Sequence, residues 1–308
     1  MSQIIVKNLS KKFGTFTAVS DLSFAIDENR VVGFLGPNGA GKTTTMRMLV
    51  GLSRPTSGSI EIAGQNVVFG DSSANKYFGY LPEQPAFYAW MTGYEYLKFV
   101  AESFGMKKDE YSSKIEKLLA TVGLTAAKNK KIGAYSNGMR QRLGIAQAVI
   151  NDPKVLIMDE PVSALDPIGR KETLQVIEKL KKNMTILFST HILSDVDKIC
   201  DDVIIIDKGK LLAFSSLSEL KEKHATQILQ IEFQSDPEKL VEDLEKEDWV
   251  TKVEKAGNKL SLVLKDDEVI QNNLPMKYFA SKGIGVISYT LNLPQVEDLF
   301  EELVKEDK

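Results

Sequence analysis

The chemically most informative residues lie between positions 36 and 43, where the chain reads Gly-Pro-Asn-Gly-Ala-Gly-Lys-Thr. This run fits the phosphate-loop pattern G-x-x-x-x-G-K-[ST], with an apolar run before it and a helical pattern after it. Glycines let successive backbone N–H groups turn toward phosphate oxygens, and the start of the following helix adds its positive dipole end. Lys42 suits the β- and γ-phosphates of a nucleotide, and the Thr43 hydroxyl suits Mg²⁺. The residues predicted to bind the nucleotide are Gly36, Asn38, Gly39, Gly41, Lys42, Thr43 and Thr44.

A pair of carboxylates, Asp159 and Glu160, ends a second apolar run that begins at Val155. In an open α/β sheet, the carboxyl ends of the strands form the ligand crevice. Asp159 is therefore a candidate to hold Mg²⁺ through water, and Glu160 is a candidate to accept a proton from an attacking water. Alone, such a pair more often begins a solvated loop. Together with the phosphate loop, it predicts nucleotide hydrolysis.

A third motif, Tyr-Ser-Asn-Gly-Met-Arg-Gln at 135–141, lies shortly before these carboxylates and resembles the signature motif of ABC ATPases. The usual form of that motif is Leu-Ser-Gly-Gly-Gln. The chain keeps Ser136 and Gly138 and departs from the pattern at Tyr135, Asn137 and Met139, whose effect on the rate stays open. The resemblance implies that Ser136 and Gly138 contact the γ-phosphate of ATP bound to another subunit. The alternative is an ordinary capped helix.

Further positions match this family in order across residues 2–220. The resemblance implies that Gln84 links Mg²⁺ and the attacking water to the transporter contact, and that His191 contacts the γ-phosphate. Asp166 falls in the loop that crosses the dimer interface. Phe13 resembles the aromatic residue that stacks on adenine, with Phe16 as the alternative, while a core position for Phe13 stays open.

The elements that must position these residues follow from hydrophobic periodicity. Alternating runs at 4–8 and 18–26 and a glycine-rich hairpin at 57–67 predict half-buried strands. Residues 85–150 are helical in pattern, and strands then alternate with helices over 155–214, as in a parallel sheet covered on both faces. With the resemblance, the predicted fold is an α/β P-loop NTPase of the ABC type, with an antiparallel β subdomain and a helical subdomain.

A separate C-terminal part is predicted beyond a short polar helix at 215–226 that resembles a linker. Strand-like runs at 228–233, 249–257, 259–265 and 285–291, interleaved with two or three helices, predict a small α+β domain of ferredoxin-like type. The predicted domains are therefore 1–222 and 223–308. The ending LNLPQVEDLFEELV, at 291–304, resembles the C-terminal helix of bacterial drug and antibiotic exporter ATPases.

Composition limits the class of protein. A formal net charge of -3 and a pI near 5.7 argue against a general nucleic-acid binder, which carries a basic excess. A single cysteine, Cys200, excludes an internal disulfide, and its position after an amphipathic stretch favours a core role over a nucleophile. No run reaches the ~20 apolar residues of a membrane span, so we expect a cytoplasmic chain that meets the membrane through a partner.

The resemblance implies a function in which ATP and Mg²⁺ bind between two nucleotide-binding domains, as a homodimer or a heterodimer. The partner would be an integral membrane transporter subunit, and the direction of transport would be export. Phe87, Tyr88 and Trp90 are candidates to dock that subunit, although such residues are more often core. The alternative function is a soluble ABC ATPase that acts on ribosomes or nucleic acid. The sequence lacks the second cassette, inserted coiled coil or basic arm that such proteins carry.

Overall fold

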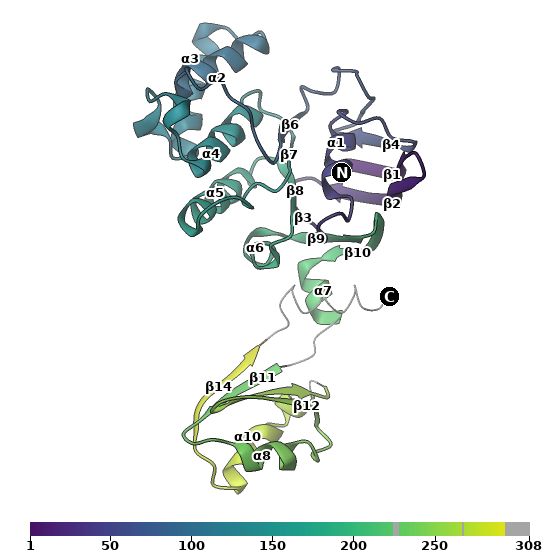
Figure 1. The fold of residues 1–308 in the computed structure, drawn as a ribbon, viewed down its shortest axis with the longest axis vertical. Coiled ribbons are helices and arrows are strands. Elements are labelled where there is room, and N and C mark those ends of the chain that lie inside the picture. Colours follow the sequence, from purple (N-terminus) through teal and green to yellow (C-terminus); the bar gives the residue numbers. More distant parts are fainter. Residues whose placement is uncertain (224–227, 267, 293–308) are drawn as a thin grey trace. The chain divides into compact units, whose positions relative to one another are not determined.

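The computed structural model describes residues 1–223, 228–266 and 268–292 (Figure 1). The chain divides into two compact units, residues 1–217 and 218–308. The first unit contains a six-stranded sheet with the order β10-β9-β3-β8-β7-β6. Its strands are β3 (Val31–Leu35), β6 (Phe78–Leu81), β7 (Val155–Met158), β8 (Thr185–Thr190), β9 (Asp202–Asp207) and β10 (Lys210–Ser216).

The pairing of this sheet places the phosphate loop beside the two carboxylates. Strands β9, β3, β8, β7 and β6 run parallel, and only β10 pairs in the antiparallel sense, with β9. Every residue of β3, β7 and β8 is buried, as expected for strands covered on both faces. The segments after β3, β7 and β8 therefore emerge at one edge, and they carry Lys42, Glu160 and His191.

Strand β6 was not predicted. Its four residues, Phe-Gly-Tyr-Leu, are too few to show a period, and a central glycine is unfavourable in a strand. The structure explains the glycine, because a Cβ at Gly79 would lie 1.9 Å from the carbonyl oxygen of Ala148. Gly79 thus lets α4 (Asn137–Ala148) approach the sheet at contact distance.

The second sheet of this unit is antiparallel, with the order β2-β1-β4-β5. It confirms the predicted hairpin and the two predicted strands, which are longer than expected. The strands are β1 (Ser2–Phe13), β2 (Phe16–Asp27), β4 (Ser57–Ile62) and β5 (Gln65–Asn66). Helix α1 (Lys42–Leu49) lies between the two sheets, because Met46 and Leu49 share one apolar cluster with Ile4 of β1 and Val32 of β3.

The other helices of the first unit lie on the side of the six-stranded sheet away from the antiparallel sheet, with α2 and α3 farthest from it (Figure 1). They are α2 (Gly93–Ser103), α3 (Lys108–Thr121), α4, α5 (Pro167–Leu180) and α6 (Leu193–Ile199). Polar caps define where three of them begin: Thr92 forms a capping box with Glu95 at α2, and Ser136 and Asp166 cap α4 and α5. None of the described helices is long and apolar enough to cross a membrane.

The second unit confirms the predicted small α+β fold. Its elements are β11 (Ile228–Phe233), α8 (Glu238–Leu244), β12 (Val250–Ala256), β13 (Lys259–Leu264), α9 (Glu268–Gln271), α10 (Leu274–Ser281) and β14 (Val286–Asn292). The strands pair antiparallel in the order β12-β13-β11-β14, which is ferredoxin-like. The core contains Leu229, Phe233, Leu262 and Phe279.

Two predictions concern the margins of this unit. The predicted linker helix exists as α7 (Leu217–Lys223). This helix continues across the predicted domain boundary after residue 222, and that boundary stays a prediction. The predicted C-terminal helix at 291–304 begins on the last residues of β14. From residue 293 onward it lies outside the described residues.

Candidate functional site

Glycines set the backbone conformation of the phosphate loop, and a lysine forms hydrogen bonds to its carbonyl oxygens. Gly41 caps α1 in the left-handed region, with φ 104°, and a Cβ there would lie 2.6 Å from the carbonyl oxygen of Ala18. Only glycine fits this position without moving β2. The Lys42 ammonium group donates hydrogen bonds to the carbonyl oxygens of Gly36, at 2.7 Å, and Pro37, at 3.2 Å. The loop therefore wraps around a buried positive charge at the start of a helix.

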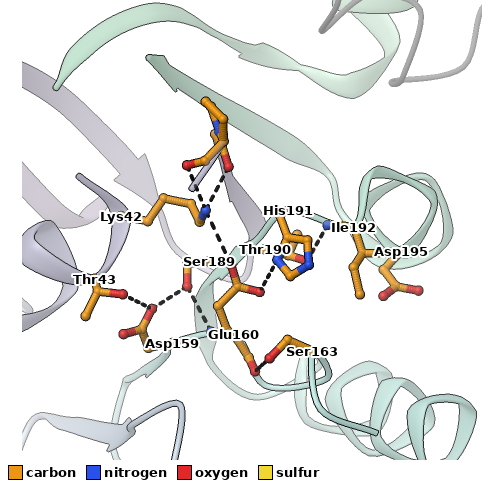
Figure 2. Close-up of polar contacts among 12 residues, drawn as sticks. Lys42, Thr43, Asp159, Glu160, Ser163, Ser189, Thr190, His191, Ile192 and Asp195 are labelled. Atoms are coloured by element: carbon orange, nitrogen blue, oxygen red, sulfur yellow. Dashed lines mark hydrogen bonds and ion pairs between the residues drawn. The ribbon is translucent and has the colours of Figure 1, made fainter. Parts of the chain in front are cut away.

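Thr43 and Asp159 place two oxygen ligands side by side at the loop (Figure 2). The Thr43 hydroxyl donates to the Asp159 carboxylate at 3.3 Å, and the Ser189 hydroxyl donates to the same carboxylate at 2.6 Å. A hydroxyl and a carboxylate suit Mg²⁺, a hard cation that keeps several waters and phosphate oxygens as its other ligands. The described residues contain no cluster of three or more acidic, histidine or cysteine side chains for a metal. The arrangement fits a cation held jointly with a nucleotide.

Glu160 lies at the centre of the charged groups (Figure 2). Its carboxylate lies 3.4 Å from the Lys42 ammonium nitrogen and 2.9 Å from Nδ1 of His191. The residue adopts φ 47°, which is uncommon for a side chain larger than glycine. Its backbone N–H donates to the Ser189 hydroxyl at 2.9 Å, so Ser189 connects the Asp159 carboxylate to the Glu160 backbone. Such local strain persists where the surrounding structure imposes it, and it is frequent at active sites.

Most of these groups, but not Asp159 and Ser189, line a cavity of about 440 Å³. Two exposed rings form its outer edge: Phe13 is 54% exposed and Phe16 is 64% exposed, which excludes a core position for Phe13. An aromatic edge and a polar floor are typical of a nucleotide pocket. The walls consist of Phe13, Phe16, Ala18, Asn38, Gly39, Gly41, Lys42, Thr43, Thr44, Glu83, Glu160, Ser163 and His191. Of the predicted phosphate-loop residues, only Gly36 is absent from this lining, and its carbonyl oxygen accepts a hydrogen bond from Lys42.

The remaining predicted residues do not line this cavity. Gln84 lines an adjacent cavity of about 290 Å³ beside α4, and Glu83 and Glu160 line both cavities. Ser136 accepts a hydrogen bond from Met139 N at 3.2 Å, and Asp166 accepts one from Gly169 N at 2.7 Å. Both caps are exposed at helix starts that touch, because a Cβ on Gly138 would lie 3.4 Å from the Gly169 Cα. One chain does not bring Ser136, Gly138 or Asp166 to its own phosphate loop.

Sequence reasoning missed three contributions to the site. One feature of the sequence could have identified Ser189: its hydroxyl lies two positions before His191, at the end of a buried strand. Asp195 is fully buried on α6 and paired with Arg170 of α5, a pairing that only the fold reveals. Tyr80 lies on β6, where burial above all, and then the Asp159 charge, raises its pKa to about 12 against a hydrogen bond from Arg47.

Cys200 does not belong to the site. It packs against the larger apolar cluster, and its Sγ lies near Gly33, where an added Cβ would be 3.2 Å away. Burial, with the nearby Asp201 charge as a smaller cause, raises the pKa of the thiol well above its ordinary value. The residue is partly buried and packs against the core, which supports the predicted core role over that of a nucleophile.

Comparison with known proteins agrees with this geometry. Residues 19–163 match the family described as ABC transporter, and residues 216–304 match the family described as ATP-binding protein DrrA1-3-like, C-terminal domain. The chain is 40% identical to the ABC transporter ATP-binding protein YxlF of Bacillus subtilis (strain 168), over 97% of this chain and 98% of that protein. It is 39% identical to the bacitracin transport ATP-binding protein BcrA of Bacillus licheniformis, over 99% of this chain and 98% of that protein. A solved ATP-binding subunit of an ABC transporter superposes with a TM-score of 0.65 at 31% identity, covering 72% of this chain and 93% of that one. The chain belongs to the ATP-binding proteins of ABC transporters, the family that hydrolyses ATP to power transport.

Proposed function

We propose that this chain is the energising subunit of a membrane exporter and that it hydrolyses ATP at the cavity lined by Lys42 and Glu160. The observation that carries the proposal is the position of the Glu160 carboxylate between Lys42 and His191, at the edge where β3, β7 and β8 end. A water beside the γ-phosphate would lie next to a base and a positive charge. Phosphoryl transfer to water needs little more than positioning and charge neutralisation.

Each residue then has a defined role in the reaction. The phosphate-loop N–H groups and Lys42 bind the β- and γ-phosphates, and the ring of Phe13 or Phe16 stacks on adenine at the cavity's edge. Thr43 and Asp159 would hold Mg²⁺, which would neutralise phosphate charge. Glu160 accepts the proton of the attacking water, and His191 orients that carboxylate.

The signature residues imply a second nucleotide-binding domain. Ser136 is exposed and Gly138 is half-buried at the start of α4, and with Asp166 they lie outside the cavity of their own chain. We therefore propose a head-to-tail dimer, of two copies or of two related chains, in which these residues complete the partner's site. The start of α4 would present N–H groups to the γ-phosphate.

The membrane partner would dock near the loop after β6. Trp90 is 66% exposed, and its ring lies 5.9 Å from that of Tyr88, which in turn lies 5.9 Å from Phe99. Phe87 instead packs against Tyr96 at 5.0 Å and is half-buried. Of the three predicted docking residues, Tyr88 and Trp90 therefore remain candidates. Gln84, in the same loop, would connect the docked subunit to the site, and the chain would lie on the inner face of the cell membrane.

Export of an antibiotic-like substrate is favoured by the relative named for bacitracin transport. The C-terminal unit, bounded near residue 222, would regulate the ATPase or its pairing. The proposal is tested by purifying the tagged chain from detergent-solubilised membranes of its source and identifying what accompanies it. A polytopic membrane protein at near-equal amounts, with ATPase activity in the complex, is the expected result. Recovery only with ribosomes, nucleic acid or soluble proteins would contradict it.

A further inference from the structure

The loop after β6 offers a carboxylate where an amide was predicted. It carries Glu83 and Gln84 in succession, both exposed. Glu83 lines the phosphate cavity together with Lys42, Thr43 and Glu160, and it also lines the adjacent cavity beside α4. Gln84 lines only the adjacent cavity. Of these two residues, Glu83 alone therefore lines the cavity that is proposed to hold the nucleotide's phosphates.

A second observation places Glu83 beside the groups that would hold the cation and the water. Glu83 and Glu160 line both the phosphate cavity and the adjacent cavity. Thr43, whose hydroxyl donates to the Asp159 carboxylate at 3.3 Å, lines the phosphate cavity with them.

The negative charge of Glu83 should affect how the site binds nucleotide and metal. Glu160 and Glu83 bring two negative charges to the phosphate cavity, and Asp159 adds a third beside Thr43. Lys42 is the only lysine or arginine among the described residues that line this cavity. A nucleotide triphosphate adds further negative charge. A carboxylate also offers a hard cation two anionic oxygens, where an amide offers one neutral oxygen. The site should therefore reject a bare nucleotide more strongly, and take up its metal complex more readily, than a site with glutamine in this place.

We propose that Glu83, and not Gln84, is the residue of this loop that faces the divalent cation and the attacking water, and that its charge makes nucleotide binding depend on the metal. The proposal rests on the proposed function, since it concerns the same ATP site. It predicts two opposite changes on replacing Glu83 with glutamine, and loss of structure alone cannot produce opposite changes.

The test uses the full chain and its Glu83→Gln and Gln84→Ala variants, with Glu28→Gln as the control for removing an exposed carboxylate outside the cavity. Binding of the imidodiphosphate analogue of ATP is measured by calorimetry in EDTA. Mn²⁺ is then titrated into the analogue-saturated chain, and free Mn²⁺ is followed by its paramagnetic resonance signal. Thermal unfolding of each variant shows whether it is folded.

For Glu83→Gln we expect Mn²⁺ affinity to fall about 10-fold and metal-free analogue affinity to rise at least about threefold. Gln84→Ala and Glu28→Gln should leave both constants within about twofold. The proposal is overturned if Glu83→Gln changes neither constant, or if Gln84→Ala weakens Mn²⁺ binding as much as Glu83→Gln does. If the unaltered chain binds no analogue with or without Mn²⁺, the proposed function itself fails, and that result is distinct from the other two.

Discussion

Replacing Arg170 with alanine should destabilise the segment that carries His191. The Arg170 Nε donates to both carboxylate oxygens of Asp195 at 2.8 Å, and its Nη2 donates to the Ser194 hydroxyl at 3.0 Å. Asp195 is fully buried on α6, which begins two residues after His191. The arginine therefore connects α5, which follows Asp166, to the helix behind His191.

The cost follows from the charge that would be left behind. Removing one partner of a buried ion pair costs about 3–5 kcal/mol. Arg170 is about one quarter exposed, and Lys198 stays 3.9 Å from Asp195, so we expect the lower end, about 3 kcal/mol. In Arg170→Ala/Asp195→Asn the uncompensated charge is gone, and about 2 kcal/mol of that loss should be recovered.

The assay is urea unfolding followed by far-ultraviolet circular dichroism, with Lys171→Ala as the matched control. Lys171 is exposed on the same helix, and its replacement should change the free energy of unfolding by less than about 0.5 kcal/mol. Because α6 supports His191, Arg170→Ala should also lower kcat with little change in KM. An unfolding free energy within 0.5 kcal/mol of the unaltered chain, or single and double variants that simply add, would refute the reasoning.

Three further predictions concern the site and its surroundings. Ser189→Ala removes the hydroxyl between Asp159 and the Glu160 backbone, so we expect about 1–3 kcal/mol of lost stability by urea unfolding and a lower kcat, and unchanged kcat would contradict the assigned role. Lys42→Ala should weaken ATP binding at least about 10-fold in equilibrium dialysis, whereas the exposed Lys12→Ala should not. The Cys200 thiol should resist alkylation at pH 8 in the native chain and react in urea, because burial raises its pKa and thiolate is the reactive form; rapid native labelling would exclude this.

The parts predictable from sequence are those whose signal is local. The phosphate loop was predicted because glycine spacing, a flanking strand and a flanking helix lie within about 20 residues. The C-terminal fold was predicted because its strands and helices follow one another in ferredoxin-like order and each shows its own period. Helix starts at Ser136 and Asp166 also carry their own capping signal.

The parts missed depend on pairs far apart in the chain. Strand β6 exists through its pairing with β7, 77 residues later, in the register Phe78 to Val155. The Ser189 hydroxyl matters because β8 places it beside β7, where it meets Asp159. Which of Glu83 and Gln84 faces the phosphate cavity is a one-residue question at the end of a short strand. Sequence position cannot answer it, since neighbouring residues of an extended chain point to opposite sides.

The most direct test of the central claim is ATP binding and hydrolysis by Glu160→Gln, compared with the unaltered chain in its complex with the membrane partner. Glutamine keeps the size of the side chain but cannot take a proton from water. If Glu160 acts as proposed between Lys42 and His191, ATP should still bind with Mg²⁺, and turnover should fall by about 10²–10⁴-fold. Near-normal hydrolysis by Glu160→Gln would contradict the account of how this site uses ATP.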